Sequence, residues 1–159
     1  MESRWGGIVV LLDATDRAVA AELVALQRAS YAVEAELIGF DGIPGLRESV
    51  EELMATGLVW LGVREGGRLA GALAYAHLAG SIDVDRLVVA PWAFRHGHGR
   101  ALVTALIERE PAGRFLVSTG SRNQPARRLY ESLGFRVVGE REIAPGILVT
   151  RYELELARG

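Results

Sequence analysis

The sequence predicts one α/β domain in which short strands and amphipathic helices are mixed along the chain. Its 159 residues are the size of a single domain, and 50% of them are hydrophobic while 24% are charged, as in ordinary soluble proteins. Short apolar runs typical of strands alternate with longer segments whose apolar residues recur at helical spacing. No repeat, low-complexity tract or linker divides the chain, so residues 1–159 are expected to form one domain.

The first half of the chain predicts a strand, two helices and a hairpin. The apolar run Ile8–Leu12 is typical of a strand, and the acidic cluster at 13–16 offers oxygen acceptors for a helix start. A helix follows from Arg17 to about Glu36, because apolar residues keep spacings of three and four without an intervening proline or glycine. The next elements are a helix over Leu46–Ala55 and a β-hairpin of Leu58–Arg64 and Arg68–His77.

The second half predicts a strand, two helices separated by a strand, and a closing hairpin. Proline or glycine stands at most of their boundaries. The elements are a strand over Ile82–Ala90, a helix over Gly99–Glu110, a strand over Phe115–Thr119, a helix over Asn123–Leu133 and a hairpin of Phe135–Glu142 and Ile147–Leu156. The expected order is β-α-α-β-β-β-α-β-α-β-β.

Composition excludes several kinds of chemistry. The sequence has no cysteine, which rules out disulfides, thiolate metal sites and intermediates on cysteine. Its 18 basic residues are all arginine, so Schiff-base chemistry and a Walker A loop, which both need lysine, are excluded. A net charge of −2 and a pI near 5.9 argue against nucleic acid as the main partner. No apolar run is long enough for a secretion signal or a membrane span, so the protein is expected to be soluble and cytoplasmic.

The segment 87–102 predicts an anion-binding site. It has the pattern of a strand, a turn containing Gly97 and Gly99, and the start of a helix. The first amides of a helix have no partner within it and carry the positive end of its dipole, and Arg95 and Arg100 can add charge-assisted contacts. A tight turn without a ligand would have the same signature. A Rossmann loop does not fit, because a leucine stands where its third glycine or alanine belongs.

A second segment indicates which anion is bound. From Asn123 to Phe135 the sequence has the pattern Asn-x-x-Ala-x-x-Leu-Tyr-x-x-x-Gly-Phe. Together with the glycine loop, this segment resembles the GNAT superfamily of N-acetyltransferases, which pair an Arg/Gln-x-x-Gly-x-Gly/Ala diphosphate loop with such a helix. The resemblance covers 82–139, with both motifs in the family's order and a strand between them. One departure is Phe94, where the family usually has arginine or glutamine.

The resemblance implies a fold and a co-substrate. The implied sheet is mixed and mostly antiparallel, has helices on both faces, and is splayed between its two central parallel strands, Ile82–Ala90 and Phe115–Thr119. Acetyl-CoA is the implied co-substrate, with its pantetheine arm along Leu87, Val88 and Val89 in a gap opened by a bulge. Asn123 corresponds to a residue that touches the pantetheine region. The residues that correspond to the family's diphosphate loop are Arg95, His96, Gly97, His98, Gly99, Arg100 and Ala101.

The implied reaction moves the acetyl group to a primary amine by direct attack in a ternary complex. Tyr130 takes the position whose hydroxyl lies near the CoA sulfur in the family. A phenol with an ordinary pKa of about 10 is protonated at pH 7, so it can donate to the departing thiolate. The alternative is that Tyr130 only packs beside Leu129 and Leu133. Backbone amides near Val88 and Val89 are the expected oxyanion donors.

The amine must lose a proton before it attacks, and Asp83 is the predicted base. In some members of the superfamily an acid at the start of the central strand has this role, and Asp83 stands at that position. Strand alternation predicts that Asp83, Asp85, Leu87 and Val89 share one face of the sheet. The alternative is that Asp83 caps the turn before its strand. Further candidates for the base are Asp85, Glu34 and Glu36.

The remaining expectations concern metals, the acceptor and partners. No metal is expected, because the i, i+2 spacing of His96 and His98 comes without nearby acids, while His77 is either simply exposed or lines the acceptor side. The acceptor is expected to be a small-molecule or peptide amine. Two acids and two aromatic residues in 31–40 could receive a cationic amine, although ordinary exposed glutamates at a helix end explain them more simply. The sequence leaves open whether the protein forms a homodimer. The alternative function is that of a non-catalytic acyl-CoA sensor or interaction module on the same fold.

Overall fold

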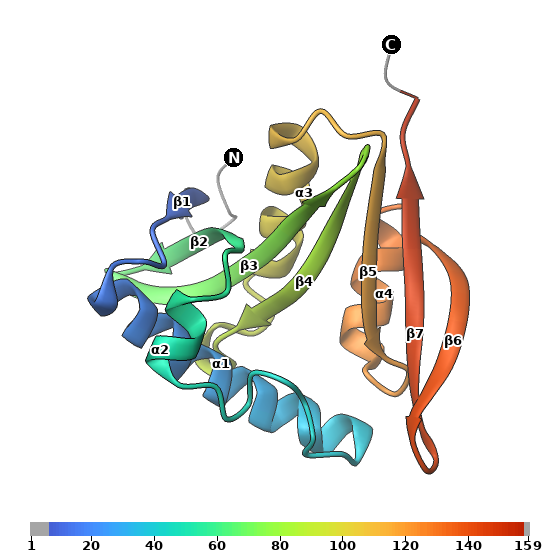
Figure 1. Cartoon of the computed structure of the whole chain (residues 1–159), viewed down its shortest axis with the longest axis horizontal. Helices are drawn as coiled ribbons and strands as arrows, with labels where there is room; N and C mark the ends of the chain where they lie inside the picture. The colour runs from blue at the N-terminus through green and yellow to red at the C-terminus, as the bar shows by residue number, and fades with distance from the viewer. Residues whose placement is uncertain (1–6, 158–159) are drawn as a thin grey trace.

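A seven-stranded sheet is the centre of the computed structural model, which describes residues 7–157 (Figure 1). The order of its strands is β1-β2-β3-β4-β5-β7-β6, and every neighbouring pair is antiparallel except β4 and β5. The predicted mixed, mostly antiparallel sheet is confirmed. The strands are β1 (Val10–Leu12), β2 (Val59–Glu65), β3 (Arg68–Leu78), β4 (Ser81–Val89), β5 (Arg114–Gly120), β6 (Arg136–Ala144) and β7 (Ile147–Glu155).

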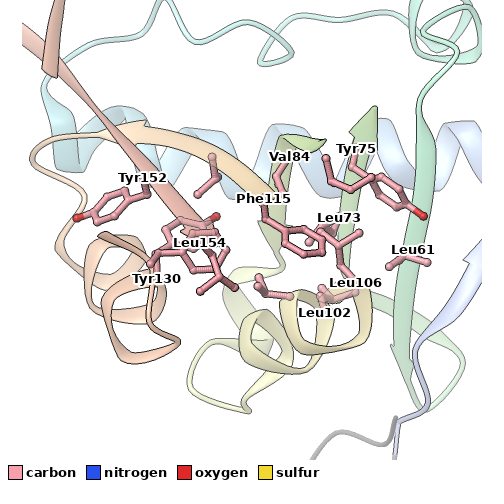
Figure 2. Close-up of a cluster of buried hydrophobic side chains, with 14 of the residues drawn as sticks. Leu61, Leu73, Tyr75, Val84, Leu102, Leu106, Phe115, Tyr130, Tyr152 and Leu154 are labelled. Carbon is pink, nitrogen blue, oxygen red and sulfur yellow. The ribbon is translucent and has the colours of Figure 1, made fainter. Parts of the chain in front are cut away.

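Helices cover both faces of the sheet, as predicted. They are α1 (Arg17–Ile38), α2 (Val50–Met54), α3 (His98–Arg109) and α4 (Gln124–Ser132), with a 3₁₀ turn η1 (Pro91–Ala93) before α3. Side chains of α1 and α2 form one core with Trp60 and the small residues of β3. Side chains of α3 and α4 form the other core around Phe115, shown in Figure 2. No helix among residues 7–157 combines the length and the apolar character that a membrane crossing requires.

Capping residues set where the first two helices begin. The side chain of Asp16 accepts from the amides of Ala18 and Val19, which starts α1 where the acidic cluster predicts it. The predicted start of the second helix at Leu46 is wrong. The side chains of Ser49 and Glu52 accept from each other's backbone amides, at 3.1 Å and 3.0 Å, and this capping box starts α2 at Val50, four residues later.

Candidate active site

The strands β4 and β5 pair over a short stretch and then separate. Their parallel ladder joins Ser81–Val84 to Arg114–Val117 and ends there. On its other side β4 stays paired with β3, but the register shifts so that Asp85 is an extra, bulged residue. Figure 1 shows the two strands meeting at one end and diverging towards α1. The predicted gap between these strands, and the bulge beside it, are confirmed.

The diverging strands open a cavity of about 1000 Å³. Its walls come from β4 after the bulge, the end of β5, α1 and the loop behind it, the loop before α3, and α4. The two sequence motifs therefore meet in one cavity. The predicted site residues that line it are Leu87, Val89, Arg95, Gly97, His98, Gly99, Arg100, Asn123 and Tyr130.

The N-terminus of α3 opens onto this cavity, and its first backbone amides have no hydrogen-bond acceptor among residues 7–157. Gly97 is the N-cap residue, and its φ of 82° lies in the left-handed region that favours glycine. No side chain among residues 7–157 caps the helix, and the amide of Ala101, which donates to the Gly97 carbonyl at 3.0 Å, makes the first bond of the helix. Arg95, with a φ of 68°, is the one non-glycine residue among 7–157 in the left-handed region. Such a loop can cradle a diphosphate.

Both histidines of this loop hydrogen-bond one carboxylate, that of Glu65 at the end of β2. Glu65 Oε1 accepts from His96 Nδ1 and from His98 Nε2, each at 2.7 Å. Burial opposes ionisation of Glu65, but these two bonds outweigh it and hold its pKa below the usual value. The expectation that no acid lies near the histidines is wrong, because β2 brings Glu65 to them across 31 and 33 positions of the sequence.

The donor atoms of Glu65, His96 and His98 lie within 4.8 Å of one another, close enough to surround a metal ion. Hydrogen bonding accounts for the same arrangement. Both contacts have the length of charge-assisted hydrogen bonds. His98 Nδ1 is buried and has no hydrogen-bond partner among residues 7–157, which fits a ring that carries its proton on Nε2 and donates it to Glu65. The cluster therefore ties the loop before α3 to β2.

Tyr130 lies where α4 meets the cavity and the core behind it (Figure 2). The side chain is 3% exposed, and its ring packs against Phe135 and Tyr152 at centroid distances of 5.5 Å and 5.9 Å. Burial, and then the negative charge of Glu34, raise the pKa of Tyr130, so its hydroxyl stays protonated. No group in the described part of the chain hydrogen-bonds this hydroxyl, which leaves it available to a ligand.

Asp83 does not line the cavity. It lies in the closed part of the gap, where it is paired with Leu116 of β5 and Ala76 of β3. The prediction that Asp83 shares a face of the sheet with Leu87 is wrong. Their partners on β3, Ala76 and Leu73, are an odd number of positions apart and so point to opposite faces. The bulge inserts one extra residue into β4 and thereby reverses the alternation of its side chains. Burial and the charge of Asp85 raise the pKa of Asp83, against a smaller lowering by Arg151.

Three further predicted contacts lie behind the cavity wall, namely Val88, His96 and Ala101. Val88 is 1% exposed and packs in the core on the side of α1. The amide of Val89, a predicted oxyanion donor, donates to Ser30 Oγ at 3.3 Å. This bond is long, so a substrate oxygen could replace the hydroxyl of Ser30.

One face of α1 forms a wall of the cavity. Among the residues on this face, the sequence predicts a catalytic role only for Glu34, as a candidate base. Tyr31, Glu34 and Ile38 follow one another at spacings of three and four and all line the cavity. Glu34 Oε1 accepts from Asn123 Nδ2 at 3.3 Å, while Asn123 Oδ1 caps α4 by accepting from the amide of Ala126 at 3.2 Å. Burial raises the pKa of Glu34, against a smaller lowering by Asn123.

Arg86, next to the bulge, joins the loop after α1 to the sheet. Its Nη1 donates to Gln27 Oε1 and Glu48 Oε1, both at 2.8 Å, and its Nε donates to Asp85 Oδ2 at 2.8 Å. The side chains of Arg86 and Glu48 are 12% and 14% exposed, so removing either leaves a desolvated charge. Nothing in the sequence separates this buried arginine from an exposed one.

The chain matches one family model and one curated protein. Residues 18–135 match the model of the acetyltransferase (GNAT) family. UPF0157 protein YqkA of Bacillus subtilis is 36% identical to the chain over 148 residues, a match that covers 92% of the chain and 43% of YqkA. The chain thus spans less than half the length of this curated relative.

Solved structures of acetyltransferases share the fold. The ribosomal-protein-S18-alanine N-acetyltransferase of Escherichia coli has a TM-score of 0.76 at 18% identity, with 96% of both chains covered. A GNAT-family acetyltransferase of Streptococcus pneumoniae has a TM-score of 0.74 at 22% identity, covering 95% of this chain and 99% of that one. YncA of Salmonella typhimurium, solved with its cofactor acetyl-CoA, has a TM-score of 0.74 at 18% identity, covering 96% and 95%.

Proposed function

Because the chain belongs to the acetyltransferase (GNAT) family, we propose that it transfers an acetyl group from acetyl-CoA to a primary amine by direct attack in a ternary complex. One observation carries the proposal. The uncapped N-terminus of α3 and the hydroxyl of Tyr130 open onto the same cavity between the separated strands. An anion cradle and a proton donor on one cavity are what transfer from a diphosphate-bearing thioester requires.

The chain's own groups suit the two ends of such a substrate. The amides from Gly97 to Arg100, with the side chains of Arg95 and Arg100, would hold the diphosphate. The free edge of β4 over Leu87–Val89 would bind the pantetheine arm as an added strand does. Asn123, at the start of α4, lines the same cavity. Acetyl-CoA itself supplies the activated thioester.

Tyr130 would donate a hydrogen bond to the sulfur as the carbon–sulfur bond breaks. A thiol has an ordinary pKa of about 8.5 and a phenol of about 10, so complete proton transfer from phenol to thiolate is uphill. Burial and the negative charge of Glu34 raise the pKa of Tyr130 further. The benefit therefore comes from stabilising the thiolate, with the proton following from the attacking nitrogen.

The proton of the ammonium needs a separate acceptor. From Asp83, the predicted base, a proton would have to pass through water to reach the cavity, because this carboxyl does not line it. The acids that do line the cavity are Glu34 and Asp85, and Asp85 is paired with Arg86. Glu36 is exposed and lies outside the lining residues.

The proposed activity is tested by calorimetry with acetyl-CoA and by thiol release with a panel of amines. We expect acetyl-CoA to bind, and thiol to be released in proportion to an acetylated amine. A panel of aminoglycosides, polyamines, amino acids, peptides and simple alkylamines covers the acceptor classes. Binding of acetyl-CoA with no transfer to any amine would favour the alternative, a non-catalytic acyl-CoA sensor on the same fold. Absence of binding would reject both.

Glu65→Ala is expected to raise the KM for acetyl-CoA about tenfold while leaving kcat within about twofold, because it frees the loop before α3 without touching the reacting atoms. Glu65→Gln keeps an oxygen acceptor and should recover part of the loss. Glu51→Ala, which breaks an exposed pair with Arg17, is the matched control and should change neither constant. Equal KM values in Glu65→Ala and wild type would show that the loop holds its shape without this carboxylate.

A further inference from the structure

The cavity contains one partly buried carboxylate that lacks a cationic partner. Among residues 7–157, Glu34 forms no ion pair, and its one hydrogen-bond partner is the neutral amide of Asn123, at 3.3 Å. The other acid of the cavity, Asp85, is neutralised by Arg86 at 2.8 Å. A desolvated carboxylate is costly unless an opposite charge accompanies it. A ligand that brings a cation to Glu34 is therefore favoured.

The surroundings of Glu34 restrict what that ligand can be. Tyr31 and Leu37, one turn to either side on α1, line the cavity with it. The loop after α1 and the last hairpin contribute apolar residues to the lining, namely Phe40, Ile43, Pro44, Ile143 and Val149. A single unpaired carboxylate in such a setting suits one positive charge on an apolar body better than a polycation.

Glu34 also lies close to the groups that would act on the thioester. Asn123, which bonds Glu34, begins α4, and Tyr130 lies two turns further along the same helix. The charge of Glu34 contributes, after burial, to the raised pKa of Tyr130. An amine held at Glu34 would therefore share one cavity with the hydroxyl proposed to face the departing sulfur.

We propose, on the premise of the acetyl transfer above, that Glu34 receives the acceptor's ammonium group and removes its proton, and that the acceptor is a monoamine carried on a compact apolar body. The ammonium gives one proton to the Glu34 carboxylate and becomes a neutral amine. The nitrogen lone pair attacks the thioester carbonyl carbon, the carbon–nitrogen bond forms and the carbon–sulfur bond breaks. The second proton of the nitrogen passes to the sulfur by way of Tyr130, and Glu34 returns its proton to water.

The test uses the full chain, acetyl-CoA and three probe amines, 2-phenylethylamine, spermidine and glycine. Glu34→Gln keeps the size of the side chain and an oxygen for Asn123 but cannot take a proton. Glu36→Gln, the same change two positions along α1 on an exposed side chain outside the cavity, is the matched control. Transfer is followed by thiol release, and acetyl-CoA affinity by calorimetry.

We expect Glu34→Gln to lower kcat/KM for 2-phenylethylamine by about 100-fold or more while changing the Kd of acetyl-CoA by less than about threefold. Since burial raises the pKa of Glu34, wild-type kcat/KM should fall with decreasing pH through a value above the ordinary carboxyl range. This acid limb should be absent from Glu34→Gln and present in Glu36→Gln.

Each contrary outcome overturns a different statement. Transfer by wild type with equal rates in Glu34→Gln and Glu36→Gln would reject the role of Glu34 and leave the acetyl transfer intact. A higher kcat/KM for spermidine or glycine than for 2-phenylethylamine would reject the apolar monoamine. Binding of acetyl-CoA without transfer to any amine would reject the proposed function itself.

Discussion

Gly97→Val is expected to lower the affinity for acetyl-CoA by at least about 100-fold, measured by calorimetry. Gly97 caps α3 with a φ of 82°, a left-handed conformation that costs an L-residue about 1–2 kcal/mol and suits a β-branched residue least. Valine would push the loop towards another conformation, and the amides at the start of α3 would no longer converge on one point. Several charge-assisted hydrogen bonds to the diphosphate would be lost together.

Gly80→Val is the control for backbone strain. Gly80 has a φ of 74°, lies in the turn between β3 and β4 outside the cavity, and has nothing within 4 Å of an added Cβ. Both variants should melt at lower temperature than wild type, but Gly80→Val should keep its affinity for acetyl-CoA. An unchanged affinity in a folded Gly97→Val would show that the amide cradle does not bind the diphosphate. His98→Ala should fall between the two, since it removes one of the bonds to Glu65.

Tyr130→Phe is expected to lower kcat about 100-fold, the low end of what general acid catalysis contributes, while KM for acetyl-CoA changes little. The phenyl ring preserves the packing against Phe135 and Tyr152, so the hydroxyl alone is lost. The estimate is at the low end because a thiolate is a moderately good leaving group and because burial makes Tyr130 a weak acid. Single-turnover kinetics should confirm that chemistry limits the rate.

Tyr152→Phe is the control for this change. The Tyr152 hydroxyl accepts from Arg127 Nε at 3.0 Å and donates to Glu131 Oε2 at 2.5 Å, and Tyr152 does not line the cavity. Its loss should reduce stability without reducing kcat. A kcat for Tyr130→Phe within about threefold of wild type, with chemistry rate-limiting, would make Tyr130 a packing residue and leave the sulfur's proton to water.

Element types followed from the sequence because their signals are local. The cap at Asp16 and the glycine that ends α1 at Gly39 are read within one turn of the helix. The start of α2 was misplaced because the apolar spacing already begins at Leu46, whereas the capping box that starts the helix uses Ser49. Propensity and spacing could not decide between these two starts.

The site was predictable where its motif is contiguous and not where distant segments meet. The loop from Arg95 to Gly99 and the helix that carries Tyr130 line the cavity as expected. Glu65 reaches the loop across more than 30 positions, and Asn123 meets Glu34 across 89, so no spacing rule could pair them. Asp83 was misplaced on its strand because alternation assumes an unbroken register and the bulge at Asp85 breaks it.

The short ladder between β4 and β5 also bears on strand pairing between molecules. Beyond Val84 and Val117 each strand has a free edge, a row of unpaired backbone groups of the kind that recruits strands from other molecules into aggregates. Here the two free edges face each other across the cavity, with α1 forming its far wall, so a second chain cannot approach either of them broadside. The edges admit a narrow, flexible ligand and exclude a folded sheet, so backbone groups in the middle of the sheet stay unpaired without offering an edge to the strand of another molecule.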